Sequence, residues 1–192
     1  MSIVKFLQQY FGNKNKLLDR AIKLEKAQYK DLDFIMQCIN DGVKEGHFKP
    51  IQREQIEEVL KVKNSDSKTL SHIFIINFNN NAIGISIITE RIKQYAIINH
   101  LNNEELYGLE INMLYVVENF RNKGIATKVI SFHERETNFP NILVRCEQSN
   151  SKEAISLFKK LGYKDIGINR QPNHKLTHMI LKKVIIKNNH NK

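Results

Sequence analysis

The segment with the clearest chemical signature runs from Leu114 to Ala126. In it an apolar strand is followed by a short turn and the pattern Arg121-x-x-Gly124-x-Ala126. A turn that enters a helix leaves several backbone N–H groups without partners at the positive end of the helix dipole. Small residues at positions 124 and 126 let an anion approach the backbone closely. The pattern therefore predicts a cradle for a pyrophosphate group.

This segment matches neither of two familiar phosphate-binding loops. No Gly-Lys-Ser/Thr follows, which excludes a Walker A loop, and the absence of Gly-x-Gly-x-x-Gly excludes the dinucleotide fingerprint. Taken alone, Arg-x-x-Gly-x-Ala also fits an ordinary basic helix start with a small residue for packing. A second segment helps to decide between a phosphate site and an ordinary helix start. It covers residues 150–163 and has the sequence NSKEAISLFKKLGY.

Together the two segments resemble the GCN5-related N-acetyltransferase (GNAT) superfamily. Its members carry Leu-x-Val-x-Pro-x-x-Arg/Gln-x-x-Gly-x-Gly/Ala, followed by Asn-x-x-Ala-x-x-Leu-Tyr-x-x-Leu-Gly-Phe. The match is firm from Glu110 to Tyr163 and extends loosely over 21–186 through the order of helices and strands. The resemblance implies an α/β (α+β) fold with a mixed, mostly antiparallel central sheet flanked by helices. It also implies an enzyme, an N-acetyltransferase with acetyl-CoA as cosubstrate and no metal.

The resemblance assigns a group of residues to acetyl-CoA. The strand Leu114-Tyr115-Val116 would pair its backbone with the pantetheine arm. The pyrophosphate would lie on the backbone N–H groups of Arg121, Asn122, Lys123, Gly124, Ile125 and Ala126. Either basic side chain of this turn could add a charge-assisted contact.

Two departures from the family pattern leave this assignment in place. Glu118 stands where the family has proline, which changes the stiffness of the turn and little else. In the second segment the family's Asn is Ser151, and Asn150 lies one place earlier, so either could meet the pantetheine. Equally, Asn150 and Glu153 could form a helix N-cap and capping box.

The third departure bears on catalysis. Many family members carry a tyrosine after Leu157 that protonates the departing CoA thiolate, whereas this chain has Phe158, which has no such proton. Another group could supply it (Tyr163, Tyr115, Ser151 or water), the thiolate could leave unassisted, or the enzyme could be slow or inactive. Unassisted departure is chemically tolerable because the pKa of a thiol is near 8.5.

The acceptor needs a base because an ordinary alkylammonium group titrates near pH 10. Glu110 is the candidate, since it lies on the strand where many family members place a Glu; the alternative is a strand-end carboxylate in solvent. In the family the acceptor sits between the first helix–helix loop and the final hairpin, here Glu45–Pro50 and Ile168–Lys175. Basic residues of that hairpin would suit an acceptor that bears a carboxylate or phosphate.

Other reactive side chains are predicted to be structural. Cys146 follows a β run and is expected to be buried as a small apolar group. His133 falls in mid-helix and is expected on the surface. His174 and His178 have i,i+4 spacing but no third ligand, so no metal site is predicted.

Hydrophobic periodicity, glycines and prolines predict the elements that would position these residues. The predicted strands are 21–27, 71–78, 82–90, 109–116, 142–146, 164–168 and 176–186. The predicted helices begin at Asp31 or Asp33, at Pro50 or Ile51, at Gly124 and at Ser151. A hairpin turn is expected at residues 79–81, a helix stop at Gly162, and an insertion at 92–106.

Length and composition fit one soluble domain of 192 residues, with 41% apolar and 26% charged residues. We expect an amphipathic N-terminal extension at 1–20, packed on the domain or on a second subunit of a homodimer. The acetyltransferase domain would cover 21–186, and 187–192 would be a disordered tail. No apolar run approaches a membrane span, and two distant cysteines indicate a reducing, cytoplasmic setting.

The net charge of +10 raises a nucleic-acid alternative, although the cations are scattered among Asn and Ile. The first functional hypothesis is acetyl transfer to a primary amine of a small molecule, peptide or protein. The alternatives are an aminoacyl-tRNA or nucleic-acid-associated acceptor, and a catalytically weak acyl-CoA-binding module.

Overall fold

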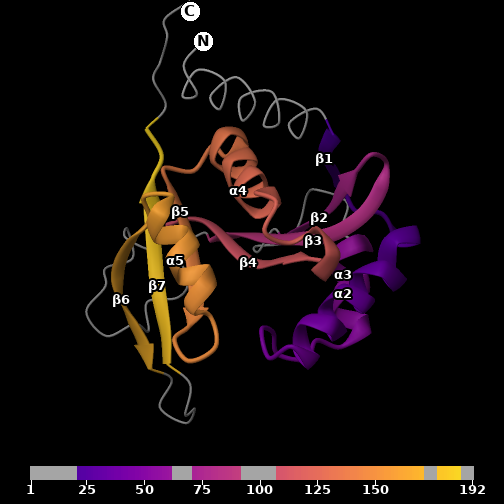
Figure 1. Cartoon of the computed structure of the whole chain (residues 1–192), viewed down its shortest axis with the longest axis horizontal. Coiled ribbons are helices and arrows are strands. Elements are labelled where there is room, and N and C mark those ends of the chain that lie inside the picture. The colour runs from indigo at the N-terminus through magenta and orange to yellow at the C-terminus, as the bar shows by residue number, and fades with distance from the viewer. Residues whose placement is uncertain (1–20, 62–70, 92–106, 171–176, 187–192) are drawn as a thin grey trace, which may run out of the picture.

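The computed structural model describes residues 21–61, 71–91, 107–170 and 177–186. The predictions for 1–20, 92–106 and 187–192 lie outside these residues. Within them, seven strands form one sheet in the order β1-β2-β3-β4-β5-β7-β6 (Figure 1). The strands are β1 (Ile22–Lys26), β2 (Ser71–Phe78), β3 (Asn81–Arg91), β4 (Gly108–Val116), β5 (Asn141–Glu147), β6 (Lys164–Arg170) and β7 (Thr177–Val184).

Every neighbouring pair in the sheet is antiparallel except β4 and β5, which are parallel and joined through helix α4 (Ile125–Glu136). The mixed, mostly antiparallel sheet flanked by helices is therefore confirmed. The predicted strands are confirmed within a few residues at their ends. The β2–β3 hairpin turns through Asn79 and Asn80, with positive φ angles of 50° and 66°, as expected for asparagines in a tight turn.

Helices cover both faces of the sheet (Figure 1). On one face α2 (Leu32–Lys44) and α3 (Arg53–Lys61) pack on β2, β3 and β4 through an isoleucine-rich cluster that includes Ile35, Ile39, Ile73 and Ile85. On the other face α4 and α5 (Lys152–Lys160) pack through Ile130 and Phe158. No helix of the described residues is long and apolar enough to cross a membrane.

Strands β4 and β5 separate soon after they pair. Their register joins only Leu109, Glu110 and Ile111 to Ile142, Leu143 and Val144. Beyond Asn112, the rest of β4 from Met113 to Val116 pairs with β3 alone. The register of β3 and β4 also shifts between Ile87 and Ile88, where Asn112 has no partner, which marks a β-bulge. The sheet therefore divides into two halves that diverge on either side of this point.

Candidate active site

The turn between β4 and α4 has the geometry of an anion-binding loop. We call residues 117–124 the phosphate loop. Asn122 and Gly124 both have positive φ angles, 60° and 77°, and α4 begins at the next residue. No side chain caps the start of α4, and its first turn contains no acidic residue. The positive end of the helix is therefore not neutralised by the usual capping groups.

Gly124 leaves space for a ligand at this helix end. A Cβ atom built at Gly124 would have no other atom within 4 Å. Its positive φ also disfavours any residue with a side chain. The first N–H groups of a helix have no acceptor within it, so they remain to bind an anion here. The loop thus has the form expected of a pyrophosphate site.

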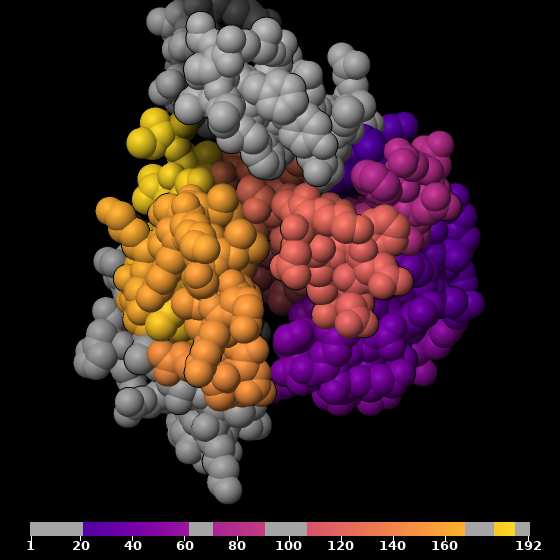
Figure 2. Space-filling model, in the orientation of Figure 1, coloured from indigo at the N-terminus to yellow at the C-terminus, as the bar shows by residue number. Residues whose placement is uncertain are grey.

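The last part of β4 leads directly to this loop. Because β5 has diverged, the edge of β4 from Met113 to Val116 is not paired with β5. An unpaired strand edge offers N–H and C=O groups to an extended chain. In the space-filling view a groove runs between α5 and the surface formed by the phosphate loop and α2 (Figure 2).

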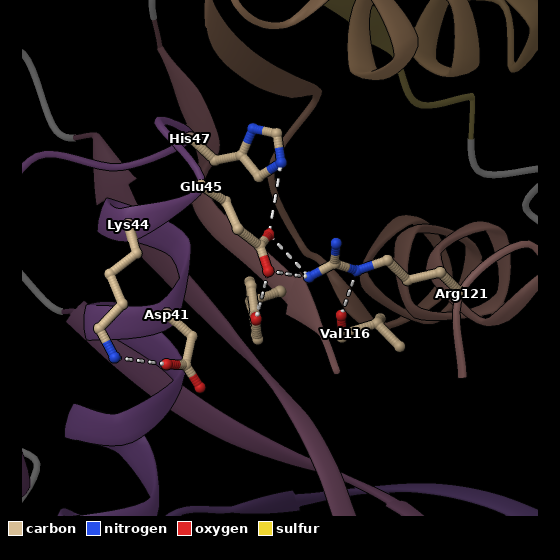
Figure 3. Close-up of polar contacts among 7 residues, drawn as sticks. Asp41, Lys44, Glu45, His47, Val116 and Arg121 are labelled. Atoms are coloured by element: carbon tan, nitrogen blue, oxygen red, sulfur yellow. Dashed lines mark hydrogen bonds and ion pairs between the residues drawn. The ribbon is translucent and has the colours of Figure 1, made fainter. Parts of the chain in front are cut away.

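An ion pair joins the phosphate loop to the end of α2. The Arg121 guanidinium donates from Nη2 to both carboxylate oxygens of Glu45, at 2.9 and 2.8 Å (Figure 3). Its Nε donates to the carbonyl oxygen of Val116 at 2.8 Å. The Tyr115 hydroxyl donates to the same Glu45 at 3.1 Å, and His47 Nε2 lies 3.5 Å from it. The Arg121 side chain thus already has protein partners.

The electrostatics of this cluster follow from its contacts. The hydrogen bond from Arg121 holds the pKa of Glu45 below its usual value. Burial, followed by the hydrogen bond to Glu45, raises the pKa of Tyr115 to about 12. A phenol with a raised pKa, whose proton is already donated to a carboxylate, is a poor source of the proton for a departing thiolate.

The loop after α2 is anchored on β4. We call residues 45–52 the acceptor loop. The backbone N–H groups of His47 and Phe48 donate to the Gly42 carbonyl at 2.8 and 3.2 Å. The ring of Phe48 packs edge-on against Tyr115, with the centroids 6.0 Å apart. A Cβ at Gly42 would lie 2.3 Å from this ring, so only glycine accommodates the packing.

The second segment approaches the acceptor loop across the groove. A Cβ built at Gly46 would lie 3.9 Å from the amide nitrogen of Asn150. Asn150 therefore lies beside the acceptor loop. The alternative of an N-cap and capping box from Asn150 and Glu153 is wrong: Ser151 is the N-cap of α5, and no side chain makes a capping hydrogen bond. Gly162 does end α5 as predicted, with a φ angle of 89°. Its N–H donates to the Lys159 carbonyl, and the N–H of Tyr163 donates to the Phe158 carbonyl.

The candidate base Glu110 is buried, with 1% of its surface exposed. Its Oε1 accepts a hydrogen bond from Arg145 Nε at 2.5 Å. Arg145 lies on β5, just beyond the last residue that pairs with β4. The ion pair therefore spans the point where the strands diverge. The alternative of a solvent-exposed carboxylate is wrong, because Glu110 is buried and paired with Arg145.

Phe158 and Tyr163 lie in the core beneath α5. Their rings pack edge-on with centroids 5.1 Å apart, and both are buried. Burial is the main cause that raises the pKa of Tyr163, and the nearby Glu134 adds to it. Tyr163 is therefore, like Tyr115, a poor proton donor, which leaves Ser151 or water among the candidates.

The expectation that His133 is exposed is wrong. Its ring is 2% exposed and packs against Phe74 and Phe132, while Nε2 is hydrogen-bonded to the buried Ser86 hydroxyl at 2.9 Å. Burial lowers its pKa to about 4. The helical position was read correctly, but α4 turns this residue toward the sheet. Cys146 is buried as expected, and burial raises its pKa to about 11.

Sequence reasoning placed Glu45 in the loop beside the acceptor but missed its ion pair with Arg121, and it missed Arg145 altogether. Glu45 does carry a signal, because an acidic residue at the C-terminal end of a helix opposes the helix dipole and suggests a compensating cation. Arg145 carries none, since its partner lies on another strand. The expected acceptor hairpin turn lies largely outside the described residues. In the part of the chain that is described, no three His, Cys, Asp or Glu side chains gather to hold a metal.

Comparison with solved structures finds many proteins of this fold. An N-acetyltransferase from Staphylococcus aureus Mu50 is 17% identical, with 86% of this chain and 99% of that chain covered and a TM-score of 0.63. A spermidine N-acetyltransferase from Vibrio cholerae, solved with CoA and spermine, is 14% identical and has a TM-score of 0.62. The match covers 86% of this chain and 96% of that chain. The ribosomal-protein-S18-alanine N-acetyltransferase from Escherichia coli is 14% identical and has a TM-score of 0.58. The match covers 89% of this chain and 98% of that chain.

At these identities the structures share the fold with this chain, and no curated protein sequence matches it. The family assignment comes from a sequence model. The model for the acetyltransferase (GNAT) domain matches residues 69–165, about half of the chain. That range contains β4, the phosphate loop and α5. The chain therefore belongs to the GNAT acetyltransferase family.

Proposed function

We propose that this protein is an N-acetyltransferase that moves the acetyl group of acetyl-CoA directly to a primary amine of a small molecule, peptide or protein. The observation that carries the proposal is the uncapped start of α4, with open space at Gly124. It lies at the end of a strand edge that β5 leaves unpaired. These features suit a ligand that has a pyrophosphate and an extended arm.

The residues present fit acetyl-CoA. Of the predicted backbone donors, Arg121 already donates its N–H to the Glu118 carbonyl at 3.0 Å. The N–H groups of Asn122 to Ala126 would hold the pyrophosphate, because a helix start and a positive-φ turn direct such groups at an anion. The backbone of Leu114, Tyr115 and Val116 would pair with the pantetheine amides. Asn150 or Ser151 would contact the arm from the start of α5. Acetyl-CoA supplies the acetyl thioester as substrate.

The reaction would be a direct aminolysis. The amine nitrogen attacks the thioester carbonyl carbon, the new C–N bond forms, and the C–S bond breaks with its electron pair on sulfur. The proton lost from nitrogen passes to a base. We propose Glu110 for this role, acting through a water molecule because Arg145 occupies one carboxylate oxygen and the side chain is buried.

The acceptor is proposed only as a primary amine. The fold neighbours include enzymes named for spermidine and for the alanine of ribosomal protein S18. The alternative of a nucleic-acid-associated acceptor has no support from the described cations, several of which pair with acids, as Arg53 does with Asp33 and Lys183 with Glu134. Two buried, free cysteines are compatible with the proposed cytoplasmic location.

The experiment is calorimetric titration with acetyl-CoA, followed by a thiol-release assay on a panel of polyamines and of peptides with free N-termini. We expect Gly124→Ala to weaken acetyl-CoA binding about tenfold or more, because a methyl group would occupy the cradle and strain the turn. Gly162→Ala is the matched control: its φ is also positive, but it lies at the far end of α5. Absence of acetyl-CoA binding by the unaltered protein would overturn the proposal.

A further inference from the structure

The Glu45–Arg121 ion pair connects two segments that lie far apart in the sequence. Arg121 belongs to the phosphate loop, and Glu45 begins the acceptor loop (Figure 3). The phosphate loop and the end of α2 border the groove beside α5 (Figure 2). Among the residues that the structure describes, this is the ion pair that joins these two loops.

The geometry of the pair fixes both partners. A single guanidinium nitrogen contacts both oxygens of the Glu45 carboxylate, while Nε is held by the Val116 carbonyl. The guanidinium also lies 5.0 Å from the centroid of the Tyr115 ring, and the hydroxyl of that ring reaches the same carboxylate. Charge-assisted hydrogen bonds with several partners restrict orientation as well as adding energy.

The rest of the acceptor loop does not depend on this pair. Phe48 packs on Tyr115 and Gly42, and two backbone hydrogen bonds reach the Gly42 carbonyl. The loop therefore keeps its anchor if the Glu45 charge is removed. Removing the Glu45 charge would break only the connection between the acceptor loop and the phosphate loop. A charge-removing variant can therefore test that connection without unfolding the acceptor loop.

We propose that Glu45 is a positioning residue whose ion pair with Arg121 couples the acetyl-CoA site to the acceptor loop, so that binding at the phosphate loop orders the place where the amine binds. This inference rests on the proposed function. A pyrophosphate bound at the phosphate loop would order that loop, and Arg121 would transmit the ordering to Glu45. Coupling of this kind is a free energy shared by the two sites.

The test is amide hydrogen exchange of the full chain with and without acetyl-CoA. In the unaltered protein we expect acetyl-CoA to slow exchange in the phosphate loop and, by about fivefold or more, in the acceptor loop. In Glu45→Gln the first effect should remain and the second should be lost. Asp41→Asn is the matched control, because this carboxylate lies one turn earlier in α2 and pairs with the exposed Lys44 at 3.3 Å.

Arg121→Gln gives an independent check on the same pair. We expect it to remove the protection of the acceptor loop as Glu45→Gln does, and the double variant to add nothing further, since both remove one interaction. With an amine substrate in hand, Glu45→Gln should raise the acceptor KM about tenfold while kcat changes less than about threefold.

The possible failures are distinguishable. If acetyl-CoA protects neither loop in the unaltered protein, the proposed function itself fails. If it protects the phosphate loop but Glu45→Gln leaves the protection of the acceptor loop intact, only the coupling role is overturned. Loss of protection in both loops in Glu45→Gln would also overturn it, because that outcome means a general weakening of the cosubstrate site.

Discussion

Phe158 replaces the residue that most simply completes the acetyl transfer, yet its place in the structure is well determined. It lies in the core against Tyr163, and neither Tyr163 nor Tyr115 is a ready proton donor. We therefore infer that the thiolate departs without a proton from either tyrosine, with Ser151 or water as the remaining proton source. This is chemically acceptable because a thiolate with a conjugate-acid pKa near 8.5 is a good leaving group compared with an amine.

Phe158→Tyr tests this inference directly. We expect kcat to change by less than about threefold, since departure of the thiolate would not limit the rate. General acid catalysis typically contributes about 10²- to 10⁴-fold. A gain of about a hundredfold in thiol release would show that the missing acid is what limits this enzyme. The acetyl-CoA dissociation constant serves as the control, because it should be unchanged if the core accepts the hydroxyl.

His133 makes a pH-dependent contribution to stability. Its pKa is about 4 in the folded protein, against about 6.5 when unfolded, because burial disfavours the charged ring. The unfolded chain therefore binds more protons between these values, so the contribution is complete above about pH 6.5 and is lost as the pH falls toward 4. At most this amounts to about 3 kcal/mol.

Urea unfolding between pH 4 and 7.5 measures the effect. We expect His133→Gln, which can still bond Ser86 but does not titrate, to show a smaller decrease in the free energy of unfolding across this range than the unaltered protein. Parallel curves for the two proteins would contradict the assignment of His133 as a buried neutral side chain.

At the scale of elements, the divergence of β4 and β5 is the feature that creates the site. Only three residue pairs join these strands, and the edge of β4 beyond Asn112 is unpaired on that side. An open edge inside a sheet leaves backbone N–H and C=O groups without hydrogen-bond partners unless a ligand or water binds them. The proposed function therefore predicts that acetyl-CoA satisfies these groups.

Hydrogen exchange followed by NMR can observe this edge one amide at a time. Without ligand we expect those amides of Met113 to Val116 that do not bond to β3 to exchange faster than the paired amides of Leu109 to Ile111. Acetyl-CoA should slow the first group and leave the second unchanged. The paired amides serve as an internal control, and equal effects on both groups would point to global stabilisation instead of strand-like pairing.

The elements themselves were largely predictable from the sequence, for physical reasons. Apolar periodicity located the strands, Gly162 ended α5, and the Asn run made the hairpin turn. The phosphate loop was predictable because its chemistry lies in consecutive residues. The contacts of Glu45 and Arg145 were not, because each depends on how segments distant in sequence come together. The face of α4 that carries His133 was misjudged, since a histidine counts as polar in a pattern but can be buried when hydrogen-bonded.

At the scale of the whole molecule, the groove depends on elements from across the chain. The acceptor loop follows α2, the phosphate loop follows β4, and Asn150 precedes α5, yet the Arg121–Glu45 ion pair and the approach of Asn150 to Gly46 bring the three together. Figure 2 shows the groove between α5 and the surface formed by the phosphate loop and α2. The proposed acetyl-CoA would contact both halves of the divided sheet, through β4 and the phosphate loop on one side and the start of α5 on the other. It should therefore stabilise the folded chain as a unit.

Thermal unfolding with added acetyl-CoA makes this quantitative. At a hundred times the dissociation constant, a ligand that binds only the folded state stabilises it by about 2.7 kcal/mol. For a chain of this size each kcal/mol raises Tm by about 2–4 °C, so a rise of about 5–10 °C is expected.

Pantetheine, which lacks the phosphates, should give a much smaller rise at the same concentration. At that fixed acetyl-CoA concentration Gly124→Ala should lose most of the shift, whereas Gly162→Ala should retain it despite similar backbone strain. An equal shift in both variants would mean that acetyl-CoA binds somewhere other than the start of α4.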